Sequence, residues 1–290
     1  MGDELTADRS TYHRGGRTGI LLIHGLGGTP VEVRFIAQGL ARAGFTVYAC
    51  QLAGHCGTPT QLRWSTWQQW YASVEEAHDR LKRDCDVILA GGLSTGALLA
   101  MHLAHNRPHD VHGLTLFSPS IILNGWSMPW YMPWLHYIRP GPLRIDFDLA
   151  EREPFGLKDE RVRAMVVNNM SEESGKEHGY FFTPLRTMLE FNSLAARVRR
   201  QLKRITTPTM ILHPREDDIA DLSNAMEIQR KMAGLVEVVV LEDSYHIITL
   251  DRQRNLVLDR TIGFAQSVER QHASAVGGHV VQHGMRRQGR

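Results

Sequence analysis

The chain has 290 residues, 42% hydrophobic and 22% charged. This composition is typical of a globular protein, and a chain of this length can bury a full hydrophobic core. The formal net charge is +2, but four arginines against one glutamate give residues 268–290 a charge of +3. The rest of the chain is therefore close to −1, which argues against a nucleic-acid-binding surface.

Cysteine content and hydropathy bear on the compartment. Three cysteines are too few for a disulfide framework, so we expect a reducing, cytoplasmic environment. No stretch approaches the roughly 18 consecutive apolar residues of a membrane-spanning helix, so we expect no integral membrane segment.

The first predicted elements follow a polar N-terminal extension, residues 1–17. Residues 18–23 (TGILLI) form a short continuous apolar run, which predicts a buried strand. A glycine-rich segment, HGLGGTP, follows at 24–30. Residues 31–43 then carry apolar side chains at helical spacing, and 45–50 (FTVYAC) predict a second strand.

The alternation of strands and helices continues through the next 70 residues or so. Ser65 or Thr66 can cap a long helix, and 86–92 predict a third strand. A helix-like run, ALLAMHLAH, occupies 97–105, and 111–118 predict a fourth strand. Continuous apolar strands alternating with helices indicate an α/β fold with a mostly parallel sheet covered on both faces. This spacing alone does not distinguish it from a nucleotide-binding doubly wound fold.

An irregular segment interrupts the pattern. Residues 121–200 are aromatic, rich in methionine and without a good strand, whereas strands and helices alternate again after them. The later elements are strands at 209–213 and 236–241 and helices at about 221–232 and 250–268. We therefore predict one α/β domain, 18–120 and 201–267, with an insertion at 121–200. Residues 268–290 lack an apolar face, so we expect them to be disordered.

The most informative stretch is Gly-Leu-Ser-Thr-Gly at 92–96, between the third strand and the following helix. A sharp turn at this point would hold the Ser94 hydroxyl clear of the backbone, and glycines two residues away on either side would let strand and helix approach closely. The strand–turn–helix context indicates a nucleophilic serine. A glycine–serine loop of a phosphate-binding fold is the alternative.

A nucleophilic serine requires a base and an acid that orients the base. In this topology they follow late strands in the order Ser, Asp, His. His246 lies in the loop after the last strand, and we predict it to be the base. His213 is the rival base, although its place at the end of a strand favours a packing role.

The acid is harder to choose from sequence because two aspartates are adjacent. Asp217 and Asp218 both follow the strand at 209–213, and neighbouring positions point in opposite directions. We favour Asp217 and keep Asp218 open. Asp243 is better explained as a structural residue in the turn before the histidine.

The oxyanion of an acyl-transfer intermediate requires preorganised N–H donors. We expect one from the backbone of Thr95, the residue after the serine, and one from Leu26 in the glycine-rich loop. A simple strand-to-helix turn is the alternative explanation of HGLGGTP.

Taken together, the motifs resemble those of small bacterial carboxylesterases related to monoacylglycerol lipases, which have the α/β-hydrolase fold. The resemblance covers residues 18–267 apart from the insertion. It implies Ser94 as nucleophile, Asp217 as acid, His246 as base, and Leu26 and Thr95 as oxyanion donors. It also implies that 121–200 is a lid. The motifs are HGLGGTP (24–30), LAGHC (52–56), GLSTG (92–96), PREDD (214–218) and SYHIITLD (244–251).

The lid contains a cluster of tryptophans interleaved with methionine and proline. Trp126, Trp130, Trp134 and Met128 suit an apolar acyl-binding surface, and we predict them to be substrate-binding residues. A lid core in which these side chains pack on one another is an equally good explanation.

Three departures from the family pattern leave the catalytic groups in place. Ala97 stands where a further glycine is common. Tyr245 precedes the histidine where glycine is usual, and Cys56 follows Gly-His in place of glycine. Cys56 is either a redox thiol beside His55 or, more simply, a small buried side chain.

We conclude from the sequence that the chain is a lidded serine carboxylesterase. Its expected substrates are small-molecule esters of apolar acyl groups, of the monoacylglycerol type or of short to medium chain length, with no metal or cofactor. A thioesterase for acyl-coenzyme A or carrier-bound acyl groups is the alternative, supported only by the basic run at 197–204. A catalytically silent receptor on the same fold is a further alternative. The sequence leaves the oligomeric state open.

Overall fold

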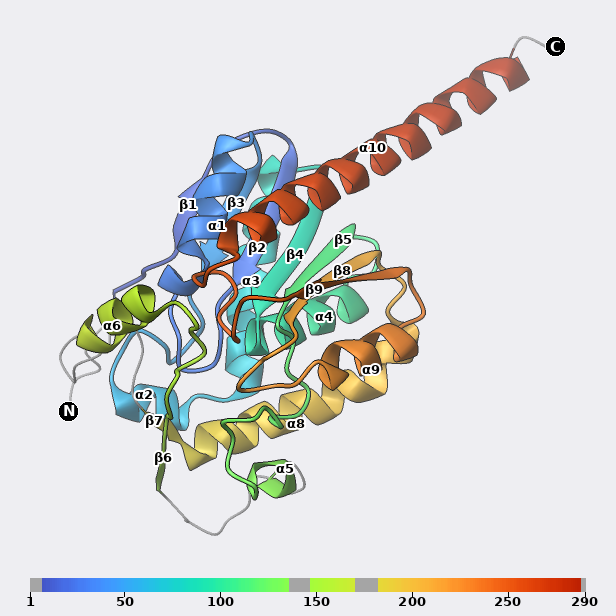
Figure 1. Cartoon of the computed structure of the whole chain (residues 1–290). Helices are drawn as coiled ribbons and strands as arrows, with labels where there is room; N and C mark the ends of the chain where they lie inside the picture. Colours follow the sequence, from blue (N-terminus) through green and yellow to red (C-terminus); the bar gives the residue numbers. More distant parts are fainter. Residues whose placement is uncertain (1–6, 136–146, 170–181, 288–290) are drawn as a thin grey trace.

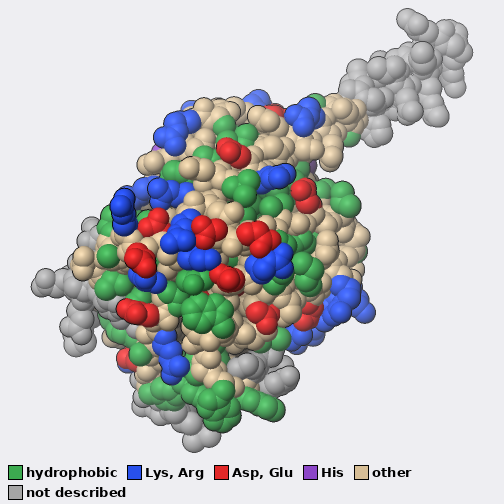
Figure 2. Space-filling view, in the orientation of Figure 1, with side chains coloured by type: hydrophobic (Ala, Val, Ile, Leu, Met, Phe, Trp, Pro, Cys, Tyr) green, Lys and Arg blue, Asp and Glu red, His purple; other side chains and the backbone are tan. Residues whose placement is uncertain are grey.

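The computed structural model describes residues 7–135, 147–169 and 182–287. Helices cover both faces of a central sheet (Figure 1). In the part of the chain that the structure describes, no helix is both long enough and apolar enough to cross a membrane. Acidic and basic side chains are interspersed over the face seen in Figure 2.

The sheet has seven strands in the order β1-β3-β2-β4-β5-β8-β9, and all are parallel except β1 at the edge. The predicted mostly parallel sheet is therefore confirmed. The strands β2, β3, β4, β5 and β8 are fully buried, which explains why the sequence shows continuous apolar runs. The strands are β1 Thr11–His13, β2 Thr18–Ile23, β3 Thr46–Cys50, β4 Val87–Leu93, β5 Gly113–Phe117, β8 Thr209–Pro214 and β9 Val236–Leu241.

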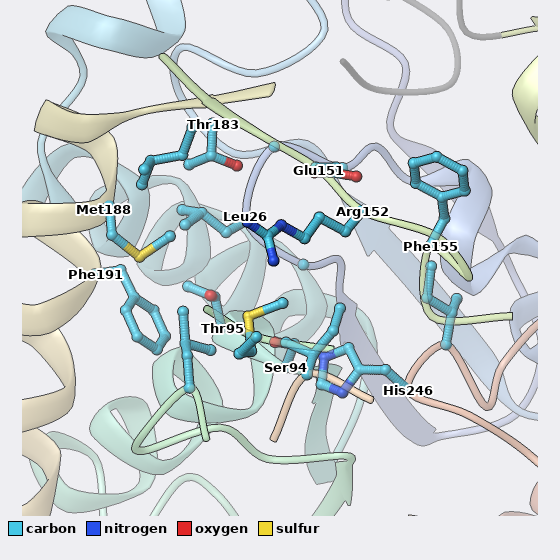
Figure 3. A pocket seen from close by; sticks show the side chains of 18 of the residues that line it. Leu26, Ser94, Thr95, Glu151, Arg152, Phe155, Thr183, Met188, Phe191 and His246 are labelled. Atoms are coloured by element: carbon cyan, nitrogen blue, oxygen red, sulfur yellow. The ribbon is translucent and has the colours of Figure 1, made fainter. Parts of the chain in front are cut away.

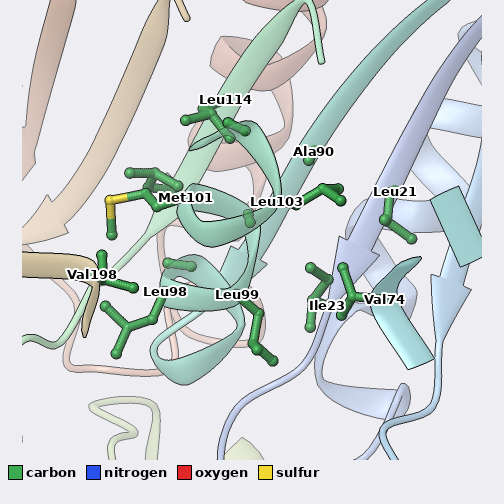
Figure 4. Packing of buried hydrophobic residues seen from close by; sticks show 14 of the residues in the cluster. Leu21, Ile23, Val74, Ala90, Leu98, Leu99, Met101, Leu103, Leu114 and Val198 are labelled. Carbon is green, nitrogen blue, oxygen red and sulfur yellow. The ribbon is translucent and has the colours of Figure 1, made fainter. Parts of the chain in front are cut away.

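Alternate side chains of the strands enter two different cores. Leu21 and Ile23 face the helices α3, α4, α8 and α9, whereas Ile20 and Leu22 face α1 and α10. Figure 4 shows the first core, with α4 packed between the sheet and α8. The helices are α1 Val31–Arg42, α2 Pro59–Trp64, α3 Trp67–Asp84, α4 Thr95–Asn106, α8 Leu185–Gln201, η1 Leu202–Arg204, α9 Ser223–Lys231 and α10 Arg254–Arg287.

Local signals set the boundaries of α3. The Thr66 side chain accepts a hydrogen bond from the Gln69 backbone, and the Gln69 side chain accepts one from the Thr66 backbone. This reciprocal capping box satisfies two N–H groups at the start of the helix, so of the two predicted caps Thr66 is the one used. Trp70 and Val74 then lie fully buried on one face.

The described residues between β5 and α8 (118–135, 147–169 and 182–184) are called the cap below. The cap contains α5 Met132–Leu135, α6 Glu160–Asn169 and an antiparallel pair of short strands, β6 Asp148–Ala150 and β7 Phe182–Pro184. The predicted insertion extends to residue 200, but α8 packs its buried face against α3 and α4. This 17-residue helix therefore belongs to the α/β core. Its apolar face needs a packing partner, and α3 and α4 provide it.

Both ends of the chain differ from prediction. Residues 11–13 of the N-terminal extension add an antiparallel strand to β3. At the other end, α10 continues through residue 287, where the sequence predicts disorder after 268. Its first half is held by Val257, Ala265 and Val268 in the core, and the helical backbone continues from that anchored part away from the body (Figure 1).

Candidate active site

Ser94 lies in the turn between β4 and α4 in a strained backbone conformation, with φ 54° and ψ −110°. The adjacent glycines make the turn possible. A methyl group on Gly92 would lie 2.5 Å from the carbonyl carbon of Gly96, and one on Gly96 would lie 2.3 Å from the carbonyl oxygen of Ile23. No side chain fits at either position, so only glycine allows β4 and α4 to approach this closely. Ser94 follows the last residue of β4 and therefore lies at the carboxyl end of the sheet.

His246 and Ser94 face each other in the pocket at this edge of the sheet (Figure 3). The His246 Nδ1 atom lies 2.9 Å from both carboxylate oxygens of Asp217. Asp217 is itself held by the backbone N–H groups of Ile219 at 2.9 Å and Ala220 at 2.8 Å. The structure thus brings together the three side chains predicted as nucleophile, base and acid, although 29 residues separate the acid from the base.

Burial disfavours the charged form of both Asp217 and His246, but their mutual attraction favours it and shifts both pKa values the other way. The pKa of Asp217 is nevertheless lowered by the charge and hydrogen bond of His246 and by nearby His213. The pKa of His246 is raised above its ordinary value because the Asp217 carboxylate, with smaller contributions from Asp218 and Glu32, outweighs burial. The pair therefore stabilises the imidazolium that forms when a histidine takes a proton.

The other candidate residues occupy different positions around the pair. Asp218 accepts hydrogen bonds from the backbone N–H groups of His246 at 3.2 Å and Gly156 at 3.0 Å, and burial raises its pKa. His213 is buried under the acid loop, where its Nε2 donates to the carbonyl of Ala220 at 2.8 Å. Asp243 is exposed and pairs with Lys158 and Arg252.

The glycine-rich loop after β2 forms another wall of the pocket, and both Leu26 and Thr95 line it. Glu32, in the first turn of α1, accepts a hydrogen bond from the backbone of Gly25 at 2.8 Å. Its carboxylate fills the space beside Gly28, where a methyl group would lie 2.1 Å away. Glu32 therefore braces the loop, a role that sequence reasoning missed because a first-turn glutamate is common at helix N-termini.

Burial raises the pKa of Glu32 to about 7, while the hydrogen bond from Gly25 and the nearby His246 act in the opposite direction. Under the same loop, the His24 side chain is fully buried and accepts a hydrogen bond from the backbone of Leu52 at 3.2 Å. Burial lowers the pKa of His24 to about 3, so this histidine is neutral and structural.

The pocket has a volume of about 460 Å³, and Ser94 is one of the residues that line it. Its lining is mostly apolar, and Met188 and Phe191 of α8 form one wall (Figure 3). The side chain of Arg152, from the cap, points into the pocket in the same view. A cavity of this size and polarity accommodates a small molecule with an apolar group beside the nucleophile.

The structure does not place the three predicted substrate-binding tryptophans in the pocket. Met128 lines the pocket, but Trp126, Trp130 and Trp134 do not, and they are 59%, 84% and 67% exposed. Trp126 instead donates a hydrogen bond to the carbonyl of Glu216, outside the cavity. Hydrophobic side chains gather at the lower edge of Figure 2, where Figure 1 places α5. Residue type alone does not indicate which side of the cap a tryptophan faces.

Cys56 is buried in a backbone conformation with positive φ (60°), and burial raises the pKa of its thiol to about 12. A thiol of this kind is unreactive, which favours the packing role over the redox role. Among the described residues, no group of three or more His, Cys, Asp or Glu side chains is placed to hold a metal ion.

Comparison with known proteins gives consistent matches over nearly the whole chain. Residues 16–253 match the Hydrolase_4 family, described as serine aminopeptidase, S33. The thermostable monoacylglycerol lipase of Bacillus sp. (strain H-257) is 29% identical over 90% of this chain and 95% of its own. The carboxylesterase of Bacillus subtilis (strain 168) is 27% identical over 88% and 95%.

A solved structure described under LipS and LipT, two metagenome-derived lipolytic enzymes, is also similar. It is 29% identical, covers 89% of this chain and 97% of its own, and superimposes with a TM-score of 0.76.

Proposed function

The chain belongs to the Hydrolase_4 family of α/β-hydrolases, and from this premise we propose that it is a serine carboxylic ester hydrolase that acts through an acyl-enzyme. The family description names a peptidase, but relatives that match along nearly their whole length are a monoacylglycerol lipase and a carboxylesterase. Esters of apolar acyl groups are therefore the proposed substrates.

The observation that carries the proposal is the Asp217–His246 pair facing Ser94 in an apolar pocket. Asp217 keeps the proton of the imidazole on Nδ1, which leaves Nε2 free to accept the Ser94 proton as Oγ attacks the ester carbonyl carbon. The backbone N–H groups of Leu26 and Thr95 receive the developing oxyanion, and each such donor contributes about 3 kcal/mol.

The same groups complete the acylation and then carry out the hydrolysis of the acyl-enzyme. The imidazolium gives its proton to the departing alcohol, which leaves an acyl group on Ser94. His246 then removes a proton from water, whose oxygen attacks the acyl carbon. The imidazolium returns that proton to Ser94 Oγ as the bond between Oγ and the acyl carbon breaks, which releases the carboxylic acid and regenerates the serine.

The thioesterase alternative is not favoured. Its only support is the basic run at 197–204, and there the Arg199 guanidinium lies 2.8 Å from the carboxylate of Glu227 on α9. An ion pair between two helices explains this arginine without an anionic carrier. A silent receptor would not need the strained turn at Ser94.

The proposed site of action is the cytoplasm. All three cysteines are free and buried, which is consistent with a reducing compartment.

A substrate panel tests the proposed function. It contains p-nitrophenyl esters from acetyl to dodecanoyl, matching acyl thioesters, and aminoacyl p-nitroanilides for peptidase activity, each measured with the wild-type protein and Ser94→Ala. We expect kcat/KM to be highest on esters and to disappear in Ser94→Ala. Faster cleavage of thioesters or anilides, or activity retained in Ser94→Ala, would reject the proposal.

A further inference from the structure

Ser120 holds the hydroxyl of the nucleophile. Its Oγ lies 3.1 Å from Ser94 Oγ and 3.1 Å from the carbonyl oxygen of Ser118. Among the described residues, no hydrogen bond joins Ser94 Oγ to the ring of His246. The Ser120 side chain is fully buried.

Proton counting orients this pair of hydroxyl groups. A serine hydroxyl has a single proton to donate. The Ser118 carbonyl can only accept, so both 3.1 Å contacts form at the same time only when Ser120 donates to that carbonyl and Ser94 donates to Ser120. In this arrangement the proton that the base must remove points away from the base.

The backbone around Ser120 is built to hold it in place. Ser118 adopts a strained, left-handed conformation with φ 44°, fixed by its N–H to the carbonyl of Leu212 at 2.9 Å. The Ser118 hydroxyl donates to the carbonyl of His246 at 2.7 Å. On the other side of Ser120, the N–H groups of Ile121 and Ile122 both donate to the side chain of Asn224, each at 2.9 Å.

We propose that Ser120 is a positioning residue that accepts the Ser94 proton in the resting enzyme, so that Ser94 must exchange Ser120 for His246 before it attacks. This inference rests on the proposed role of Ser94 as nucleophile. Removal of the Ser120 hydroxyl leaves the His246 Nε2 atom as the partner of Ser94. That new hydrogen bond stabilises the neutral imidazole and lowers the pKa of His246.

The test measures how fast a small fluorophosphonate labels the protein between pH 5 and 9. In this reaction the Ser94 oxygen bonds to phosphorus, fluoride leaves, and the serine proton passes to His246. The variants are Ser120→Ala and Ser120→Thr, which keeps a hydroxyl. Ser65→Ala is the matched control, because Ser65 is also buried and donates to a carbonyl, at 2.8 Å, but lies outside the pocket.

For Ser120→Ala at pH 6, we expect labelling about three- to tenfold faster than in the wild type, the range of one net hydrogen bond. The half-maximal rate should also move to lower pH. Ser120→Thr and Ser65→Ala should retain the wild-type pH midpoint. Thermal melting establishes that each variant is folded, and Ser120→Gly replaces Ser120→Ala if the latter is not.

Two failures are distinguishable. If wild-type protein is labelled at Ser94 but Ser120→Ala shows the same rate and midpoint, or labels more slowly, the role of Ser120 is rejected and the proposed function stands. If mass spectrometry finds no label on Ser94 of the wild-type protein, the proposed nucleophile and the role of Ser120 are both wrong.

Discussion

Asp217 contacts His246 through both of its carboxylate oxygens, each 2.9 Å from Nδ1. Because an ionised carboxylate only accepts hydrogen bonds, the imidazole proton lies on Nδ1 and the Nε2 lone pair is left for Ser94. This relationship underlies the first two predictions.

Ser94→Ala is expected to lower kcat by about 10³–10⁶-fold, because a nucleophile and its base act as one unit. Covalent labelling by a fluorophosphonate should vanish, while the melting temperature should remain within a few degrees of the wild type. Retention of half the activity would show that another residue is the nucleophile.

Asp217→Asn is expected to lower kcat by on the order of 10⁴-fold, since an amide no longer holds the imidazole in the tautomer with its proton on Nδ1. Asp218→Asn should cost at least about tenfold less, because Asp218 contacts the His246 backbone and not its ring. Steady-state kinetics of both variants on one ester make the comparison. Equal losses would mean that the two carboxylates share the role.

Glu32→Gln is expected to change the pH dependence of both stability and activity. The folded pKa of Glu32, about 7, lies above its ordinary value of 4.5, so its stabilising effect is present at low pH and lost as the pH rises through 7. Glutamine does not ionise but still accepts the hydrogen bond from Gly25. The melting temperature of Glu32→Gln should therefore exceed that of the wild type by more at pH 9 than at pH 5.

The same substitution removes a negative charge that raises the pKa of His246. Because the base must be neutral to accept a proton, the rise of kcat/KM with pH should move to lower pH in Glu32→Gln. Glu76→Gln, at an exposed position on α3, is the control and should change neither profile. Unchanged profiles in Glu32→Gln would contradict the assigned coupling.

Acyl-chain preference should depend on α8 and not on the cap tryptophans. Each buried CH₂ of substrate contributes about 0.8 kcal/mol, so kcat/KM should increase with chain length until the pocket is full. Met188→Ala should alter this dependence, because Met188 lines the pocket. Trp130→Ala is the control, since its exposed ring lies outside. A changed chain-length profile in Trp130→Ala alone would reverse this assignment.

Truncation of α10 should have an effect that depends on where it is made. Glu269 accepts a hydrogen bond from Thr18 at 2.6 Å, and the His272 ring lies 4.7 Å from the ring of His112. Removal of residues after Val268 should therefore lower the melting temperature by about 2–4 °C, the effect of roughly 1 kcal/mol. Removal of residues after Ala275 should leave it unchanged. Equal melting temperatures for both truncations would show that these contacts contribute nothing.

The sequence by itself determined the features that depend on neighbouring residues. Continuous apolar runs mark the parallel strands, because a strand buried on both faces has no polar side, and the glycines at 92 and 96 mark the turn at Ser94. The order of motifs along the chain also indicated the family and the loops that would hold the acid and the base.

Only the tertiary structure decided the choices that depend on distances between remote residues. Asp217 and Asp218 are equivalent by position, and the fold alone turns one toward the ring of His246 and the other toward its backbone N–H. Likewise, Met188 enters the pocket while Trp130 stays outside, because the packing of α8 and the path of the cap set their directions. Local sequence fixes which side chains are available, and long-range packing fixes which of them meet.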